Sequence, residues 1–199
     1  MELTSPLISM AERFATEWIV KRIGRTRLFH GLAHTQSVVH SCVELAKLEL
    51  FSVEESEALV VAAWFHDTGY LIGSQGHEHE SVRIATSFVK AQGSTDEFLQ
   101  VVRDLILSTR MPTAPNGLLQ QILCDADMNH LGSADYPQRE ALLRLELEIA
   151  EGIVMSDHEW LKKNIGFFEK HRYYTEHARQ KWNEQKQINL ARLRRCSGL

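Results

Sequence analysis

Histidine and aspartate residues stand at positions in three helical segments where apolar side chains would be expected. His34 begins an apolar stripe, His66 ends a second stripe with Asp67 beside it, and Asp127 ends a third. Residues three or four positions apart share one face of a helix, so these side chains should point toward the core. The chain contains ten histidines, and neutral imidazole is a common metal ligand and acid–base group.

The buried carboxylates need a compensating positive charge. An unpaired carboxylate in a protein interior costs several kcal/mol, and no lysine or arginine lies between Lys47 and Arg83. A divalent cation held by two imidazoles and two carboxylates would balance both charges. A hydrogen-bonded core histidine and a helix-capping His–Asp pair are the structural alternatives, and spacing alone leaves both interpretations open.

Helical periodicity runs through almost the whole chain, and no segment alternates apolar and polar residues over six positions. Glycines and prolines separate the helical runs, and Ser52 with Glu55 forms a capping-box pattern. We therefore predict an all-α fold, a single bundle of about eight to ten helices. The expected helices include a first one around residues 8–19, then 38–46, 54–66, 82–91, 97–107, 118–127, 139–154 and 159–168.

Composition excludes several classes of protein. The chain has 199 residues, 44% of them hydrophobic, and its longest apolar run, residues 58–65, is too short to cross a membrane. We read no secretory signal at the N-terminus. Three widely spaced cysteines match neither a disulfide framework nor a zinc knuckle. These features predict a cytoplasmic protein with no membrane partner.

The C-terminal segment is basic. From Lys170 onward there are eight basic and two acidic residues, although the whole chain has a net charge of −4. Such a helix can bind RNA or can pack on an acidic body, and the second interpretation is favoured because no nucleic-acid motif accompanies it. We therefore expect no nucleic-acid partner, and a homodimer stays an open alternative.

Three short motifs resemble an ordered family signature. They are FHGLAHT at residues 29–35, AAWFHDTGY at 62–70 and CDADM at 124–128. In this order and separation they are similar to the H…HD…D signature of the HD-domain metal-dependent phosphohydrolases. The resemblance implies one HD-like domain over residues 1–199, with a motif core at 28–132 and C-terminal helices at 138–195 packing on it.

By this resemblance His34, His66, Asp67 and Asp127 would be the metal ligands. Asp125 competes for the last place, and Asp127 is preferred because the family ligand normally follows a small residue. Two imidazoles and two carboxylates suit one divalent transition metal, namely Mn, Fe, Ni, Co or Zn, with Mg as an alternative. The ion would activate a water molecule for attack on phosphorus.

Further residues are candidates for catalysis and substrate binding. The expected catalytic residues are Asp67, which would orient the water, together with His77 and Arg110. His77 begins HEHES, which resembles a family HExxS segment, whereas His79 in the same segment has the appearance of an exposed residue. Ser108 and Thr109 stand where two-metal relatives carry a histidine, which argues against a second metal.

Substrate contacts are expected from His30, His77, Arg110 and His130. The resemblance then implies a phosphomonoesterase or phosphodiesterase that acts on a nucleotide or a related phosphoester. The alternative is a catalytically silent HD fold that binds a nucleotide or second messenger. Fold alone does not identify the substrate.

Overall fold

A computed structural model describes residues 5–23 and 27–197 of the chain. Within these ranges it has nine α-helices, three short segments of other helix types and no strand, which confirms the all-α prediction. The elements are α1 (Pro6–Trp18), η1 (Ile19–Ile23), α2 (Leu32–Ala46), α3 (Val53–Phe65), η2 (Thr68–Ile72), α4 (His77–Ala91), α5 (Asp96–Ser108), α6 (Leu118–Asp127), η3 (Asn129–Gly132), α7 (Tyr136–Glu151), α8 (Asp157–Lys170) and α9 (Glu176–Ser197).

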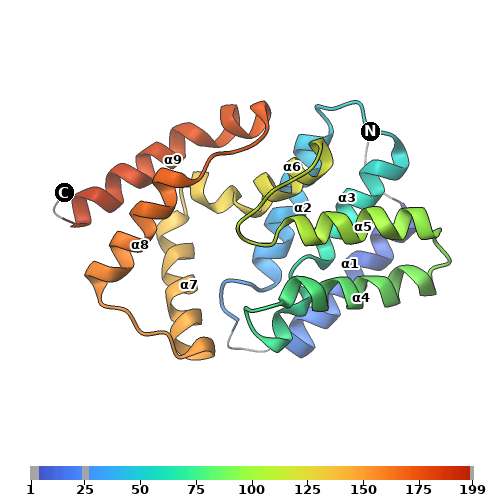
Figure 1. Cartoon of the computed structure of the whole chain (residues 1–199), viewed down its shortest axis with the longest axis horizontal. Coiled ribbons are helices and arrows are strands. Elements are labelled where there is room, and N and C mark those ends of the chain that lie inside the picture. Colours follow the sequence, from blue (N-terminus) through green and yellow to red (C-terminus); the bar gives the residue numbers. More distant parts are fainter. Residues whose placement is uncertain (1–4, 24–26, 198–199) are drawn as a thin grey trace.

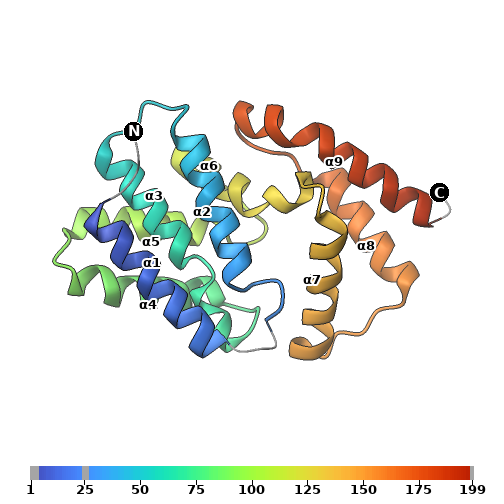
Figure 2. The same ribbon diagram turned by 180° about the vertical axis from the view of Figure 1, so that it is seen from behind.

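Helix α3 is the centre of the larger layer. It packs against α1, α2 and α5, and its residues 58–65 are all buried. In Figure 1 and Figure 2, α1, α3, α4 and α5 lie on one side of the molecule and α7, α8 and α9 lie on the other, with α2 and α6 between them. The apolar run of the sequence is therefore a core helix.

The helix starts follow the local chemistry. Ser52 and Glu55 form the expected capping box at α3, and the Thr95 hydroxyl accepts a hydrogen bond from the backbone N–H of Phe98 at the start of α5. Three helices begin at least three residues earlier than predicted, namely α2, α4 and α7. Their first turns hold mostly polar residues, which give no apolar period. Pro137 is one of the prolines expected to separate helical runs, but it lies in the first turn of α7, where proline is tolerated.

The C-terminal layer has its own apolar cluster, formed by Leu131, Tyr136, Ile165, Phe168, Leu190 and Leu193. Helix α9 holds this layer against η3. The Asn189 side chain donates hydrogen bonds to the carbonyl oxygens of Leu131 and Ser133 at 2.9 and 2.8 Å. A Cβ atom on Gly132 would lie 2.4 Å from the Cβ of Trp182, so η3 and α9 are in close contact.

Several basic residues of α9 pair with acidic groups of the body. Lys181 lies 2.6 Å from Glu44 of α2, and Arg194 lies 2.7 Å from Glu169 of α8. This arrangement agrees with a basic helix that packs on an acidic surface. Among the described residues, no helix has the length and apolar character that crossing a bilayer needs.

Candidate metal centre

The structure brings the four predicted ligands to one point. His34 lies in the first turn of α2, His66 caps the end of α3, Asp67 follows it directly, and Asp127 ends α6. The Nε2 atom of His34 lies 3.1 Å from Asp127 Oδ1 and 3.3 Å from Asp67 Oδ2. The Nε2 atom of His66 lies 3.2 Å from Asp67 Oδ2, 3.5 Å from Asp127 Oδ1 and 3.4 Å from His34 Nε2.

These separations and the hydrogen bonds around them fit a bound cation. Neighbouring ligand atoms lie about 3 Å apart around an ion with bonds of about 2.1 Å. The His66 Nδ1–H donates to the Ala63 carbonyl oxygen at 2.7 Å, which leaves the Nε2 lone pair facing the cluster. The buried Asp67 Oδ2 has no hydrogen-bond partner among the described residues. His34, His66 and Asp127 alone already meet the spacing that a metal site requires.

The electrostatics of the cluster also call for positive charge. Burial raises the pKa of Asp67, but the charge of His66 and the close approach of both imidazoles outweigh it and hold that pKa well below its usual range. Burial lowers the pKa of His66, but Asp67 and Asp127 outweigh it and raise that pKa well above its usual range. The two buried carboxylates therefore need positive charge beside them, which either protonated imidazoles or a bound metal ion would supply.

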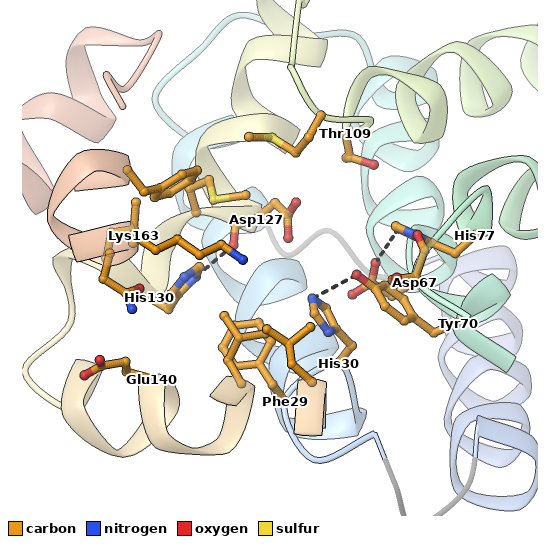
Figure 3. A pocket seen from close by; sticks show the side chains of 18 of the residues that line it. Phe29, His30, Asp67, Tyr70, His77, Thr109, Asp127, His130, Glu140 and Lys163 are labelled. Atoms are coloured by element: carbon orange, nitrogen blue, oxygen red, sulfur yellow. Dashed lines mark hydrogen bonds and ion pairs between the residues drawn. The ribbon is translucent and has the colours of Figure 1, made fainter. Parts of the chain in front are cut away.

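His77 lies beside Asp67 because η2 and α4 pack without space for a side chain. A Cβ atom on Gly69 would lie 2.0 Å from the carbonyl oxygen of His77. The His77 Nδ1–H donates to the Ser74 carbonyl oxygen at 2.8 Å, and Nε2 lies 3.6 Å from Asp67 Oδ1. Figure 3 shows His77, Asp67 and Tyr70 side by side. His79, by contrast, is exposed on α4.

His30 is held by a carboxylate that sequence reasoning missed. Glu146 of α7 is 1% exposed and accepts three hydrogen bonds, from the backbone N–H groups of Phe29 and His30 at 2.8 and 3.0 Å and from His30 Nδ1 at 2.6 Å. His30 Nε2 lies 3.1 Å from the Tyr70 hydroxyl. Burial raises the pKa of Glu146, but the hydrogen bonds from His30 and Phe29 bring it below its usual value.

His130 and Arg110 lie on two other elements and line a pocket beside the cluster. His130 Nδ1 lies 3.3 Å from the Asp127 carbonyl oxygen, and burial lowers the pKa of His130 to about 3, so this imidazole is neutral. Arg110 follows the end of α5 and is exposed, with its side chain on the pocket wall. Ser108 and Thr109 donate their hydroxyl groups to carbonyl oxygens within α5.

Asp125 lies away from the cluster and holds the segment that precedes α9. Its carboxylate accepts hydrogen bonds from the backbone N–H groups of Tyr174 and Thr175 and from the Thr175 hydroxyl at 2.7–2.8 Å. Thr175 in turn caps the start of α9, since its hydroxyl accepts from the N–H of Ala178. The structure therefore favours Asp127 over Asp125 as the ligand.

A pocket of about 960 Å³ adjoins the cluster. Asp67, Asp127, His30, His77, Arg110 and His130 are on its wall, so six of the predicted site residues share it. Figure 3 shows the labelled side chains around this space. Sequence reasoning missed the opposite wall, which α7 and α8 supply with Glu140, Trp160, Lys162, Lys163, Phe167 and Lys170. A charged residue on an otherwise apolar face, the signal used for Asp127, also marks Glu146.

Comparison with known protein families assigns the chain to one of them. A family model described as HD domain matches residues 31–130. The chain belongs to the HD domain family. HD domain proteins form a superfamily of metal-dependent hydrolases whose members bind divalent metals. The matched range contains all four candidate ligands and ends before α7, so the wall formed by α7 and α8 lies outside it.

Two solved structures share the fold of this HD domain protein. One is a protein from Lactobacillus plantarum, with a TM-score of 0.72 and 16% identity over 98% of this chain and 97% of the other. The second is described as a predicted HD superfamily hydrolase from an uncultured Thermotogales bacterium, with a TM-score of 0.61 and 19% identity over 92% and 89% of the two chains. No curated protein matches the sequence.

Proposed function

We propose that this HD domain protein is a phosphohydrolase that acts on a nucleotide or a related phosphoester, either a monoester or a diester. The observation that supports the proposal best is the cluster of two imidazoles and two carboxylates beside a pocket of about 960 Å³. Phosphoryl transfer depends mainly on positioning and on positive charge, and this pocket provides ligands for a cation and basic side chains.

His34, His66, Asp67 and Asp127 would hold one divalent metal ion through the four atoms that face each other. When bound, such an ion lowers the pKa of water and neutralises charge on a phosphoryl oxygen. The Ser108 and Thr109 hydroxyl groups are occupied by hydrogen bonds within α5, which supports the proposal of a single ion.

Asp67 and His77 would position the attacking water. One carboxylate oxygen of Asp67 faces the imidazoles, and the other faces His77 Nε2 at 3.6 Å. Because His77 Nδ1 donates to Ser74, Nε2 of the neutral ring carries a lone pair that can accept a proton. These two residues can therefore orient a water molecule and remove its proton.

Arg110, His30 and His130 would contact the substrate. Arg110 brings a permanent positive charge to the pocket wall, and a guanidinium can donate two parallel hydrogen bonds to a phosphate. Glu146 fixes the orientation of the His30 ring. Neutral His130, whose Nδ1–H faces the Asp127 carbonyl oxygen, can accept one hydrogen bond at Nε2.

The proposal is tested by metal loading and a substrate panel. The purified chain is stripped of metal, reloaded with Mn, Fe, Ni, Co, Zn or Mg, and assayed with nucleotides, cyclic dinucleotides and p-nitrophenyl phosphates. We expect turnover with at least one ion. Asp67→Ala should lose bound metal and at least about 100-fold in activity, since it removes a ligand that also positions water. His158→Ala, at an exposed position of α8, should retain both.

Two outcomes would contradict the proposal. In the first, metal analysis shows that the site is loaded, no substrate is hydrolysed, and a nucleotide still raises the melting temperature. That result would indicate a silent binding module. Full activity and full metal content in Asp67→Ala would show that the site lies elsewhere.

A further inference from the structure

One face of helix α8 presents an ordered set of groups to the pocket. Lys163, Gly166, Phe167 and Lys170 are spaced at three, four and seven residues from the first, so they share one side of the helix. All four line the pocket that adjoins the metal centre. Figure 3 shows Lys163 extending from α8 into this space. We call these four residues the α8 stripe.

The lysines of the stripe have no carboxylate partner. Among the described residues, basic side chains near the pocket such as Arg27 and Arg144 form ion pairs, with Glu151 and Asp157, whereas Lys163 and Lys170 enter none. Glu140, the acidic group on the same wall, accepts a hydrogen bond from the Trp160 indole at 2.6 Å. The positive charge of the stripe is therefore available to a ligand.

Gly166 leaves room between the two lysines. A Cβ atom added at Gly166 would meet nothing within 4 Å. A glycine in the middle of a helix costs up to about 1 kcal/mol relative to alanine, and no close contact with another element compensates for it here. The stripe thus combines two cations, an open gap that exposes the helix backbone, and the ring of Phe167.

The two walls of the pocket differ in chemistry. One wall holds the candidate ligands Asp67 and Asp127, and the wall formed by α7 and α8 holds the stripe with apolar neighbours such as Leu143, Leu147 and Trp160. A volume of about 960 Å³ is of the size of pockets that enclose whole small molecules. A single phosphate at the metal would leave most of it unfilled.

We infer that the α8 stripe is a second phosphate subsite, so that the substrate carries a further phosphate besides the one at the metal, as a nucleoside di- or triphosphate does. This inference rests on the proposed function for the identity of the metal-bound end. Lys163 and Lys170 bind the second phosphate by charge-assisted hydrogen bonds, Gly166 lets it approach the helix, and the apolar wall accommodates the organic part.

The test measures discrimination between ligands with one and several phosphates. The metal-loaded chain is titrated by calorimetry with adenosine monophosphate, a methylene-bridged analogue of adenosine triphosphate, and inorganic tripolyphosphate. We expect the two polyphosphates to bind at least about tenfold more tightly than the monophosphate. In the double variant Lys163→Gln/Lys170→Gln this preference should fall about tenfold or more, because charge-assisted contacts are lost. Gly166→Leu, which fills the gap and keeps both charges, should weaken the polyphosphates selectively.

Lys90→Gln is the matched control, since Lys90 is exposed on α4 and lies outside the pocket; its preference should equal that of the unmodified chain. An unchanged preference in both the double variant and Gly166→Leu would overturn the inference, whatever the turnover. A lost preference in those variants, together with no hydrolysis by the loaded unmodified chain, would support the subsite and contradict the proposed hydrolase.

Discussion

Two aspartates only two residues apart illustrate how position on a helix assigns a role. Asp127 lies beside both imidazoles of the metal centre, at 3.1 and 3.5 Å, while Asp125 accepts three hydrogen bonds from the segment that begins α9. Burial raises the pKa of Asp125 despite those hydrogen bonds. The same chemical group thus serves a ligand cluster in one case and a helix junction in the other.

This contrast predicts opposite phenotypes. Asp127→Ala should lose bound metal, because a ligand is removed. Asp125→Ala should bind metal normally but be destabilised by about 1–3 kcal/mol, the cost of leaving buried donors unpaired. Metal analysis by mass spectrometry and urea unfolding measure the two effects. Metal loss in Asp125→Ala at a temperature where it is fully folded would contradict this division of roles.

Among the helices, α7 contributes one carboxylate, that of Glu146, which orients His30 beside the candidate metal centre. Glu146 reaches across to the residues that precede α2 and fixes both the backbone and the ring of His30. It also lies 3.9 Å from Arg27, which pairs with Glu151 at 2.6 Å. A helix outside the family match therefore orients a residue next to the candidate ligand His34.

We predict that Glu146→Gln lowers activity about 10- to 100-fold, the usual effect of losing a hydrogen bond that orients a site group. Bound metal should be unchanged, because the hydrogen bonds and ion pairs that Glu146 forms go to Phe29, His30 and Arg27, and these are not candidate ligands. Glu148→Gln is the control and should behave as the unmodified chain, since Glu148 lies on the same helix and, within the described ranges, pairs only with Arg144. Steady-state kinetics with parallel metal analysis would decide; equal rates for the two variants would remove the proposed role of Glu146.

The helices themselves could be predicted well, since buried positions recur with helical period, and so could the residues of the ligand cluster. Helix starts such as His77 were missed because polar first turns carry no period. The contact between His30 and Glu146 joins residues 116 positions apart, and periodicity contains no information about such pairs. The sequence pattern does not single out Lys163 and Lys170, because their pocket exists only after α8 has folded against the other layer.

At the scale of the whole molecule, α9 packs against α8, η3 and α6 and so contacts both layers. One of its lysines is buried in this contact. Lys186 is 1% exposed, and its ammonium donates to the His171 carbonyl oxygen at 2.6 Å. Burial, with a smaller contribution from Arg172, lowers the pKa of Lys186 from 10.5 to about 8. The protonated form is thus disfavoured in the folded state relative to the unfolded chain.

This shift predicts a pH dependence of stability. Between pH 8 and 10.5 the unfolded chain binds more protons at this position than the folded one, so the free energy of unfolding should rise with pH in that window. Lys186→Met removes the contribution. The unfolding free energy of the unmodified chain minus that of the variant should therefore increase from pH 8 to 10.5, by about 1–2 kcal/mol after solvent screening. A difference that stays flat across this range would contradict the prediction.

The contact between α9 and η3 has a consequence for the order in which the protein is completed. A chain is synthesised from its N-terminus, so all four metal-centre residues exist before any part of α9 has been made. Until Asn189 arrives, the carbonyl oxygens of Leu131 and Ser133 lack its hydrogen bonds, and Gly132 has no Trp182 against it. In a nascent chain the four candidate ligands are therefore made first, α7 and α8 with the opposite wall of the pocket follow, and the contacts of α9 with η3 form only after both.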